Sequence, residues 1–105
     1  MFARVTLAEV DTVRVSLDEA IELYKASVIP AMQEQEGYEG VCVLATPEGK
    51  AMVITFWESA EASEAGVQSG FYAEQVQKFV TFYRAVPGRE GYDVVIAEMP
   101  GVPIG

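Results

Sequence analysis

The chain has 105 residues, 50% of them hydrophobic, and a formal net charge of −9 from 16 acidic and 7 basic side chains. This length predicts a single domain, and the hydrophobic content excludes a disordered chain. Because the acidic balance repels nucleic-acid phosphates and anionic lipid headgroups, we expect neither nucleic acid nor a membrane as a partner.

The sequence contains one cysteine, Cys42, and no histidine. A lone cysteine cannot form an intrachain disulfide and is typical of a reducing compartment, so we expect a cytoplasmic protein. We expect no signal peptide, because the first residues lack its basic start and apolar core. The missing histidine removes the commonest general base and the commonest metal ligand, and we expect no metal site.

The first third of the chain predicts a strand followed by a helix. Apolar and polar residues alternate over 2–9, which indicates a strand. Ser16, with a glutamate three residues later, is a capping box that starts an amphipathic helix extending to about residue 35. Pro30 lies inside this helix and predicts a kink, and Gly37 provides its left-handed stop.

The middle of the chain predicts a hairpin. Residues 38–46 and 50–57 are rich in β-branched and aromatic side chains, which favours two strands. The segment Pro47-Glu48-Gly49 between them places proline and glycine where a tight turn needs a fixed φ and a positive φ.

The last third predicts two helical segments and a final strand. A helical stretch begins at Ser59, with breaks expected at Gly66 and Gly70. A helix is then predicted over 71–85 and a strand over 90–98.

The element order β-α-β-β-α-β is the split βαβ arrangement of a ferredoxin-like α+β domain, in which both helices cover one face of a four-stranded antiparallel sheet. We expect this domain to span 1–99, followed by a tail over 100–105 that contains Pro100, Gly101 and Pro103.

The predicted strands are apolar on both faces. The middle strand has Met52, Ile54 and Phe56 on one side, and Val53 and Trp57 on the other. Two helices cover only one face, and an exposed apolar sheet is a site of association. We therefore expect a homodimer packed sheet to sheet.

Two segments carry a family resemblance: Ile29-Pro30-Ala31-Met32 with Glu36-Gly37-Tyr38-Glu39-Gly40, and Val53-Ile54-Thr55-Phe56-Trp57-Glu58-Ser59. With them the chain resembles the antibiotic biosynthesis monooxygenase family of dimeric α/β barrels, over about residues 2 to 98. The resemblance implies the dimeric barrel and, in the cofactor-independent branch, oxidation of a flat apolar or phenolic compound by O₂. It therefore implies no cofactor.

The heme-degrading branch of this family is tested by three positions. It uses an asparagine on the first strand, a tryptophan closing the third strand and an axial histidine on the second long helix. Only Trp57 matches, since Ala3 and Gln75 stand at about the other two positions. We do not expect heme degradation.

Four aromatic residues are candidates for substrate binding. Trp57 closes a strand, where its ring would stack on an aromatic substrate; the alternative is a core residue that joins the strand to the next helix. Tyr72, Phe79 and Tyr83 share a helix face and would form the walls of a pocket; the alternative is an aromatic stripe that only builds the core.

Arg4 is the fifth candidate. It lies on the first strand of an otherwise apolar sheet, so its guanidinium must find an anion, either a substrate group or a carboxylate such as Asp93 or Glu98 on the paired strand.

Three functions remain open. The leading hypothesis is a cofactor-free monooxygenase acting on a small apolar or aromatic molecule. The second is a non-catalytic barrel that binds a hydrophobic metabolite, and the third is an isomerase or cyclase on the same fold. The sequence assigns no catalytic residue.

Overall fold

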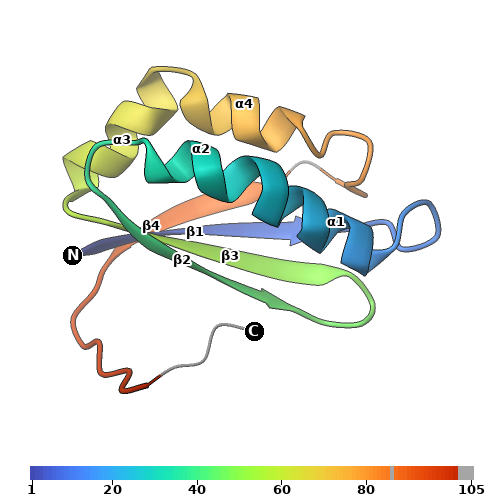
Figure 1. The fold of residues 1–105 in the computed structure, drawn as a ribbon, viewed down its shortest axis with the longest axis horizontal. Coiled ribbons are helices and arrows are strands. Elements are labelled where there is room, and N and C mark those ends of the chain that lie inside the picture. The colour runs from blue at the N-terminus through green and yellow to red at the C-terminus, as the bar shows by residue number, and fades with distance from the viewer. Residues whose placement is uncertain (86, 102–105) are drawn as a thin grey trace.

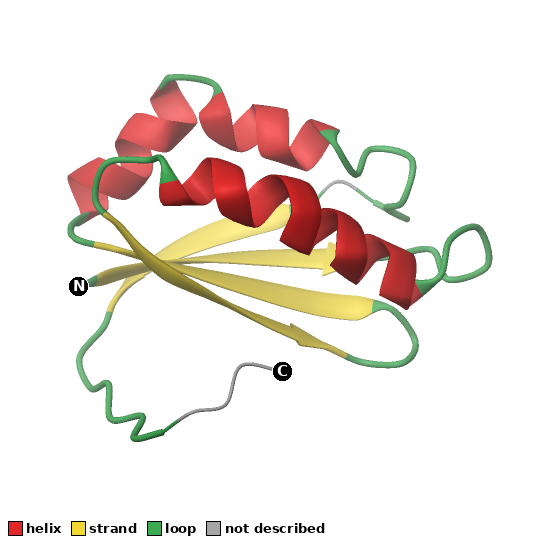
Figure 2. Cartoon of the chain, in the orientation of Figure 1, coloured by secondary structure: helices red, strands yellow, loops and turns green. Residues whose placement is uncertain are grey.

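A four-stranded antiparallel sheet, covered on one face by helices, makes up the computed structural model, which describes residues 1–85 and 87–101 (Figure 1). The strands are β1 (Phe2–Glu9), β2 (Tyr38–Ala45), β3 (Lys50–Trp57) and β4 (Gly88–Asp93), in the order β2-β3-β1-β4. Figure 2 shows the two layers, with helices above the sheet. The predicted ferredoxin-like α+β fold is confirmed.

The first three strands follow the sequence pattern closely. β1 and β3 have the predicted bounds, and β2 ends one residue earlier than predicted. The turn between β2 and β3 depends on Gly49, whose φ is +98° and whose N–H donates to the carbonyl of Thr46 at 3.0 Å. A Cβ at Gly49 would lie 2.3 Å from the carbonyl oxygen of Val10, so only glycine fits there.

The first helical region has three segments: α1 (Leu17–Leu23), the π-helical turn η1 (Tyr24–Val28) and α2 (Ile29–Gln33). Ser16 caps α1 as predicted, because its Oγ accepts the N–H of Glu19 at 3.1 Å. Just before Pro30, where a kink was predicted, the structure has the π-helical turn η1. The N–H of Ile29 bonds to the carbonyl of Tyr24, five residues back, and Pro30 has no N–H to donate.

The second helical region consists of α3 (Ala60–Gln68) and α4 (Phe71–Gln77). Ser59 caps α3 by accepting the N–H of Ala62 at 3.1 Å. Only one of the two expected glycine breaks occurs. Gly70, with φ of +87°, separates the helices, whereas Gly66 is buried within α3 and continues it.

The helix predicted over 71–85 was too long, because α4 ends at Gln77. After a series of tight turns the chain meets the end of β1, where Val10 and Tyr83 form an isolated antiparallel bridge. The N–H of Asp11 donates to the carbonyl of Phe82 at 2.7 Å, and the N–H of Arg84 donates to the carbonyl of Glu9 at 2.9 Å. These long-range bonds replace the helical ones.

The strand predicted over 90–98 was also misplaced, since β4 runs from Gly88 to Asp93. Its neighbour β1 begins at Phe2, which pairs with Asp93, and one further bond joins the N–H of Val94 to the carbonyl of Met1 at 3.0 Å. Beyond that point β1 offers no partner. The chain then leaves the sheet on the side away from the helices (Figure 1). Pro103 of the predicted tail lies outside the described residues.

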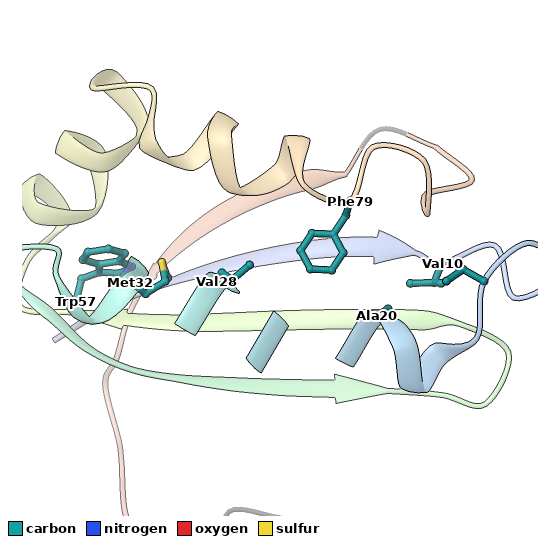
Figure 3. Packing of buried hydrophobic residues seen from close by; sticks show 7 residues of the cluster. Val10, Ala20, Val28, Met32, Trp57 and Phe79 are labelled. Carbon is teal, nitrogen blue, oxygen red and sulfur yellow. The ribbon is translucent and has the colours of Figure 1, made fainter. Parts of the chain in front are cut away.

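The core lies between the helices and the sheet (Figure 3). Its buried residues are Val10, Val15, Ala20, Val28, Met32, Trp57 and Phe79. No helix covers the opposite face, which we call the outer face. It exposes large apolar side chains at Leu7, Leu44, Met52 and Tyr92. The prediction of a sheet that is apolar on both faces is confirmed.

No helix within the described residues is long and apolar enough to cross a membrane.

Candidate functional site

A cavity of about 110 Å³, which we call the inner cavity, lies between the sheet and the helices. Strands β1, β2 and β3 form its floor, and α1, η1, α2 and α4 form its roof. It borders edge strand β2, where the lining residues Val43 and Ala45 are exposed. The lining is mostly apolar, and its polar side chains are those of Arg4, Thr6, Tyr24, Thr55, Tyr72, Gln75 and Tyr83.

Tyr72 and Thr6 form a polar pair in the inner cavity. Tyr72 projects from α4 and Thr6 from β1, and their hydroxyl oxygens are 3.2 Å apart, with either one able to donate. A hydroxyl pair of this kind can donate to or accept from a ligand oxygen.

Two more phenols and a phenyl ring lie along the roof. Phe79 packs against Tyr24 and Tyr83, with ring centroids 6.1 Å apart in both pairs. Burial raises the pKa of Tyr83 to about 12. Burial also raises the pKa of Tyr24, with a smaller contribution from the nearby Tyr38. Both phenols are therefore neutral at physiological pH and act as hydrogen-bond donors rather than as bases.

Arg4 is buried at the border of the inner cavity, where its side chain is only 5% exposed. Its Nη1 donates to the backbone carbonyl of Ser63 at 3.3 Å, and its Nε has no hydrogen-bond partner. The guanidinium carbon lies 5.2 Å from the centroid of the Trp57 ring and 4.5 Å from that of Tyr72. Two aromatic rings and one carbonyl thus surround the cation.

The alternative that Arg4 pairs with Asp93 or Glu98 is wrong for this chain on its own. Among the described residues, no carboxylate oxygen lies within 4 Å of the guanidinium. Since β4 ends at Asp93, Glu98 is beyond the sheet, and both acids are exposed.

Trp57 lies in the core rather than in a cavity wall. It has no exposed surface, and its indole N–H donates to Oγ1 of Thr55 at 2.9 Å. The Trp57 ring holds the Arg4 side chain in place, because it packs against the guanidinium and, edge to face, against Tyr38. The structure thus favours the alternative in which Trp57 joins strand to helix.

A second cavity of about 460 Å³, which we call the outer cavity, also lies on the helix side of the sheet and shares Arg4 with the inner cavity. It is formed by β1, α3 and β4, and Phe2, Arg4 and Arg89 line it together with the acidic residues Glu61, Glu64 and Glu90. Arg4 lines both cavities, so its side chain divides them.

Of the five predicted site residues, the structure brings four to the inner cavity: Arg4, Tyr72, Phe79 and Tyr83. The polar lining residues that were not predicted from the sequence are Thr6, Tyr24, Thr55 and Gln75. Strand alternation places Thr6 on the same face as Arg4, and helical spacing places Tyr24 on the buried face of its helix, so both signals were present. Gln75 is buried, and its Oε1 accepts from Nζ of Lys78 at 2.7 Å, a contact that sequence does not indicate.

No group of three or more acidic or cysteine side chains capable of holding a metal ion occurs in the described part of the chain.

Neither a protein-family model nor a curated protein matches this chain. Solved structures do. A putative antibiotic biosynthesis monooxygenase from Bordetella bronchiseptica has a TM-score of 0.73 at 15% identity, covering 90% of this chain and 97% of that one. A monooxygenase from the gene ActVA-Orf6 of Streptomyces coelicolor, in complex with nanaomycin D, has a TM-score of 0.73 at 18% identity, covering 95% and 92%.

A third structure is a mutant of MhuD with two manganese protoporphyrin IX molecules bound per active site. It has a TM-score of 0.65 at 22% identity and covers 94% of this chain and 99% of that one. The chain therefore has the fold of the antibiotic biosynthesis monooxygenases, as the resemblance implied. Since one fold holds such different ligands, the fold does not determine what this chain binds, and the residues of the site do.

Proposed function

We propose that this protein is a cofactor-independent monooxygenase that holds a flat apolar or phenolic compound in the inner cavity. The observation that carries the proposal is the lining of that cavity, which is apolar apart from a few hydroxyls, one amide and one guanidinium. Small-molecule sites are built in this way, with apolar walls and a few polar groups that orient the ligand. The shared fold with the nanaomycin-bound monooxygenase supports the same class of ligand.

In the proposed chemistry the substrate itself supplies the electrons that reduce O₂. A substrate carbanion reduces O₂ directly; for an anthrone, the methylene loses two hydrogens and gains one oxygen atom, and the other oxygen atom leaves as water. The chain excludes water and hydrogen-bonds the developing phenolate. The hydroxyls of Tyr72 and Thr6, together with the neutral phenol of Tyr83, are the donors available for that oxygen.

The size of the inner cavity restricts what enters without rearrangement. Its volume of about 110 Å³ is below the range of about 300–1,000 Å³ that is usual for ligand sites. A single ring therefore suits the cavity as it stands, and a fused-ring substrate requires the cavity to enlarge. The exposed Val43 and Ala45 mark the side at edge strand β2 where the cavity reaches the surface.

An O₂-uptake assay tests the proposal with a panel of quinols, dihydroxynaphthalenes and anthrones. We expect uptake with at least one compound and a loss of about a hundredfold or more in the Tyr72→Phe variant, since the removal of one donor to a developing oxyanion typically costs that much. Tyr92→Phe is the matched control, because Tyr92 lies on the outer face and lines neither cavity. No uptake across the panel, or equal loss in both variants, would count against the proposal.

We also propose that the functional unit is a homodimer in which two outer faces pack together. The support is the exposed apolar surface of four strands, which a second copy of the chain covers by symmetry. Sedimentation equilibrium at micromolar concentration is expected to give twice the mass of one chain. A stable monomer under these conditions would contradict the dimer.

A non-catalytic binding protein is the second candidate, and one observation favours it. The ionisable side chains that line the inner cavity are one arginine and three tyrosines, with no carboxylate among them. The same observation weakens the isomerase or cyclase hypothesis, whose proton shuttle would have to be a tyrosine. Saturable binding of a panel compound without O₂ uptake would identify a binding protein.

A further inference from the structure

Arg4 is a buried cation that no acidic group neutralises. Its side chain is 5% exposed, no carboxylate oxygen in the described residues lies within 4 Å, and Nε has no hydrogen-bond partner. A buried charge without a counter-ion is costly, and buried charges are normally paired. Neither the hydrogen bond to the Ser63 carbonyl nor the two neighbouring aromatic rings neutralises the charge.

A second cation approaches the same place. Arg89 on β4 lies over the Tyr72 ring, with its guanidinium carbon 5.2 Å from the centroid, while that of Arg4 is at 4.5 Å. Strand pairing produces this arrangement, because Arg89 pairs with Thr6, two residues along β1 from Arg4. Burial, and to a smaller extent the charge of Arg89, lowers the pKa of Arg4, but an arginine remains charged at neutral pH. Two positive charges thus converge on one ring in a chain whose net charge is −9.

The acidic groups nearby all lie on one side of Arg4. Glu61, Glu64 and Glu90 line the outer cavity and are exposed; Glu64 acts on Arg4 only from a distance. The inner cavity has no acidic residue in its lining. An anion that approaches Arg4 from the inner cavity therefore meets positive charge and hydroxyl groups without repulsion from a carboxylate.

We propose that Arg4 and the hydroxyl of Tyr72 bind the carboxylate of an aromatic acid whose ring occupies the inner cavity, while Arg89 adds positive charge from the outer cavity, which it lines. The placement of the ligand's aromatic ring in the inner cavity rests on the proposed function. The recognition of its carboxylate by Arg4 is the new inference. The bond to Ser63 uses Nη1 and leaves the edge with the unpaired Nε. Because Nε is buried, the side chain has to shift before this edge presents two parallel N–H groups to a carboxylate. The substrate class narrows from flat apolar compounds to those that carry an acidic substituent.

Trp57 provides the readout for the test. It is the only tryptophan, and its ring centroid is 5.2 Å from the guanidinium carbon of Arg4, so its indole N–H signal in ¹⁵N–¹H NMR spectra reports on the site. The probes are benzoate and its neutral isostere benzamide, because a single ring suits the cavity volume. We expect benzoate to bind at least about tenfold more tightly, as is typical of a charge-assisted hydrogen bond.

The variants separate the site from general charge effects. Arg4→Met keeps most of the side-chain volume and is expected to abolish the preference for benzoate, whereas Arg89→Gln reduces it by a smaller factor because Arg89 is exposed. Arg14→Gln removes the same charge from an exposed loop position that lines neither cavity, and is expected to keep the preference.

Equal affinity of the wild-type protein for benzoate and benzamide would overturn the proposal, even if Arg4→Met fails to fold. So would a preference that survives in a folded Arg4→Met variant, or one that disappears in Arg14→Gln. The oxygenase proposal stands or falls separately, because O₂ uptake is not measured here. A protein that prefers benzoate through Arg4 and consumes no O₂ would keep the anion site and lose the oxygenase function.

Discussion

At the scale of single residues, the chemistry of this site depends on how three polar groups are satisfied. The hydroxyl of Thr55 accepts the indole N–H of Trp57 and donates to the backbone carbonyl of Arg4. The guanidinium of Arg4 then rests on the Trp57 ring. Arg4 and Trp57 are candidates from the sequence, but no sequence pattern indicates that Thr55 already accepts the indole N–H that would otherwise donate to a substrate.

Thr55→Val tests the importance of this hydroxyl. Valine has the same shape but leaves the fully buried indole N–H of Trp57 without an acceptor, so we expect a loss of about 1–3 kcal/mol in the free energy of unfolding. Urea denaturation followed by circular dichroism measures the loss. Thr81→Val, at an exposed position, is the control and should change stability by less than about 0.5 kcal/mol. Equal effects of the two variants would mean that the hydrogen bond contributes nothing.

Tyr83 predicts a pH dependence of stability. Its pKa is 10.0 in an exposed reference and about 12 in the folded chain, so the folded state holds the phenolic proton more tightly than the unfolded state. This contribution to stability is complete below pH 10 and is lost as the pH rises through 12. In Tyr83→Phe we therefore expect the urea midpoint to decline less steeply from pH 10 to 12 than in the wild type. An unchanged slope would show that Tyr83 ionises freely in the folded protein.

At the scale of elements, the strands with strong side-chain alternation were predicted well, and the elements that end on long-range contacts were not. The pattern over 2–9 and 50–57 predicts β1 and β3 to the residue. In contrast, α4 stops at Gln77 because Tyr83 bridges Val10, and β4 stops at Asp93 because β1 begins at Phe2. Helical propensity continues past Gln77 and strand propensity past Asp93, but the backbone with which the chain pairs determines where each element ends.

Gly91 on β4 gives a test of packing between neighbouring strands. A Cβ built there would lie 2.4 Å from Cζ of Phe2, whose ring lies against the glycine. We expect Gly91→Ala to push that ring aside and lower the thermal midpoint by several degrees, as for an overpacking change of about 1–3 kcal/mol. Gly88→Ala is the matched control on the same strand, since nothing lies within 4 Å of its added Cβ. Equal midpoints for the two variants would show that Phe2 moves without cost.

At the scale of the whole molecule, the sheet has two apolar faces, of which only one is covered by helices. One face, with Val53 and Thr55, lines the inner cavity beneath the helices, while the other exposes Met52, Leu44 and Tyr92. A monomer of this size seldom exposes so much contiguous apolar surface without an association partner. The proposed dimer follows from this imbalance.

Met52→Lys tests the interface directly. It places a charge on a central strand of the outer face, where Met52 is 38% exposed, and burial of that charge against a second copy of the chain is unfavourable. We expect the variant to sediment as a folded monomer at concentrations where the wild type is dimeric. Ala26→Lys adds the same charge to an exposed helix position and should remain dimeric. A dimeric Met52→Lys variant would place the interface elsewhere.

The sequence alone determined the α+β order of elements, the two-faced apolar sheet, and four of the side chains that line the inner cavity. These features follow from local periodicity, which the chain carries whatever its partners are. Only the tertiary structure decided the rest: where α4 and β4 end, that Trp57 belongs to the core, and that Arg4 faces aromatic rings instead of Asp93 or Glu98. Each of these features depends on a contact between residues that are distant in the sequence, and local sequence patterns do not indicate such contacts.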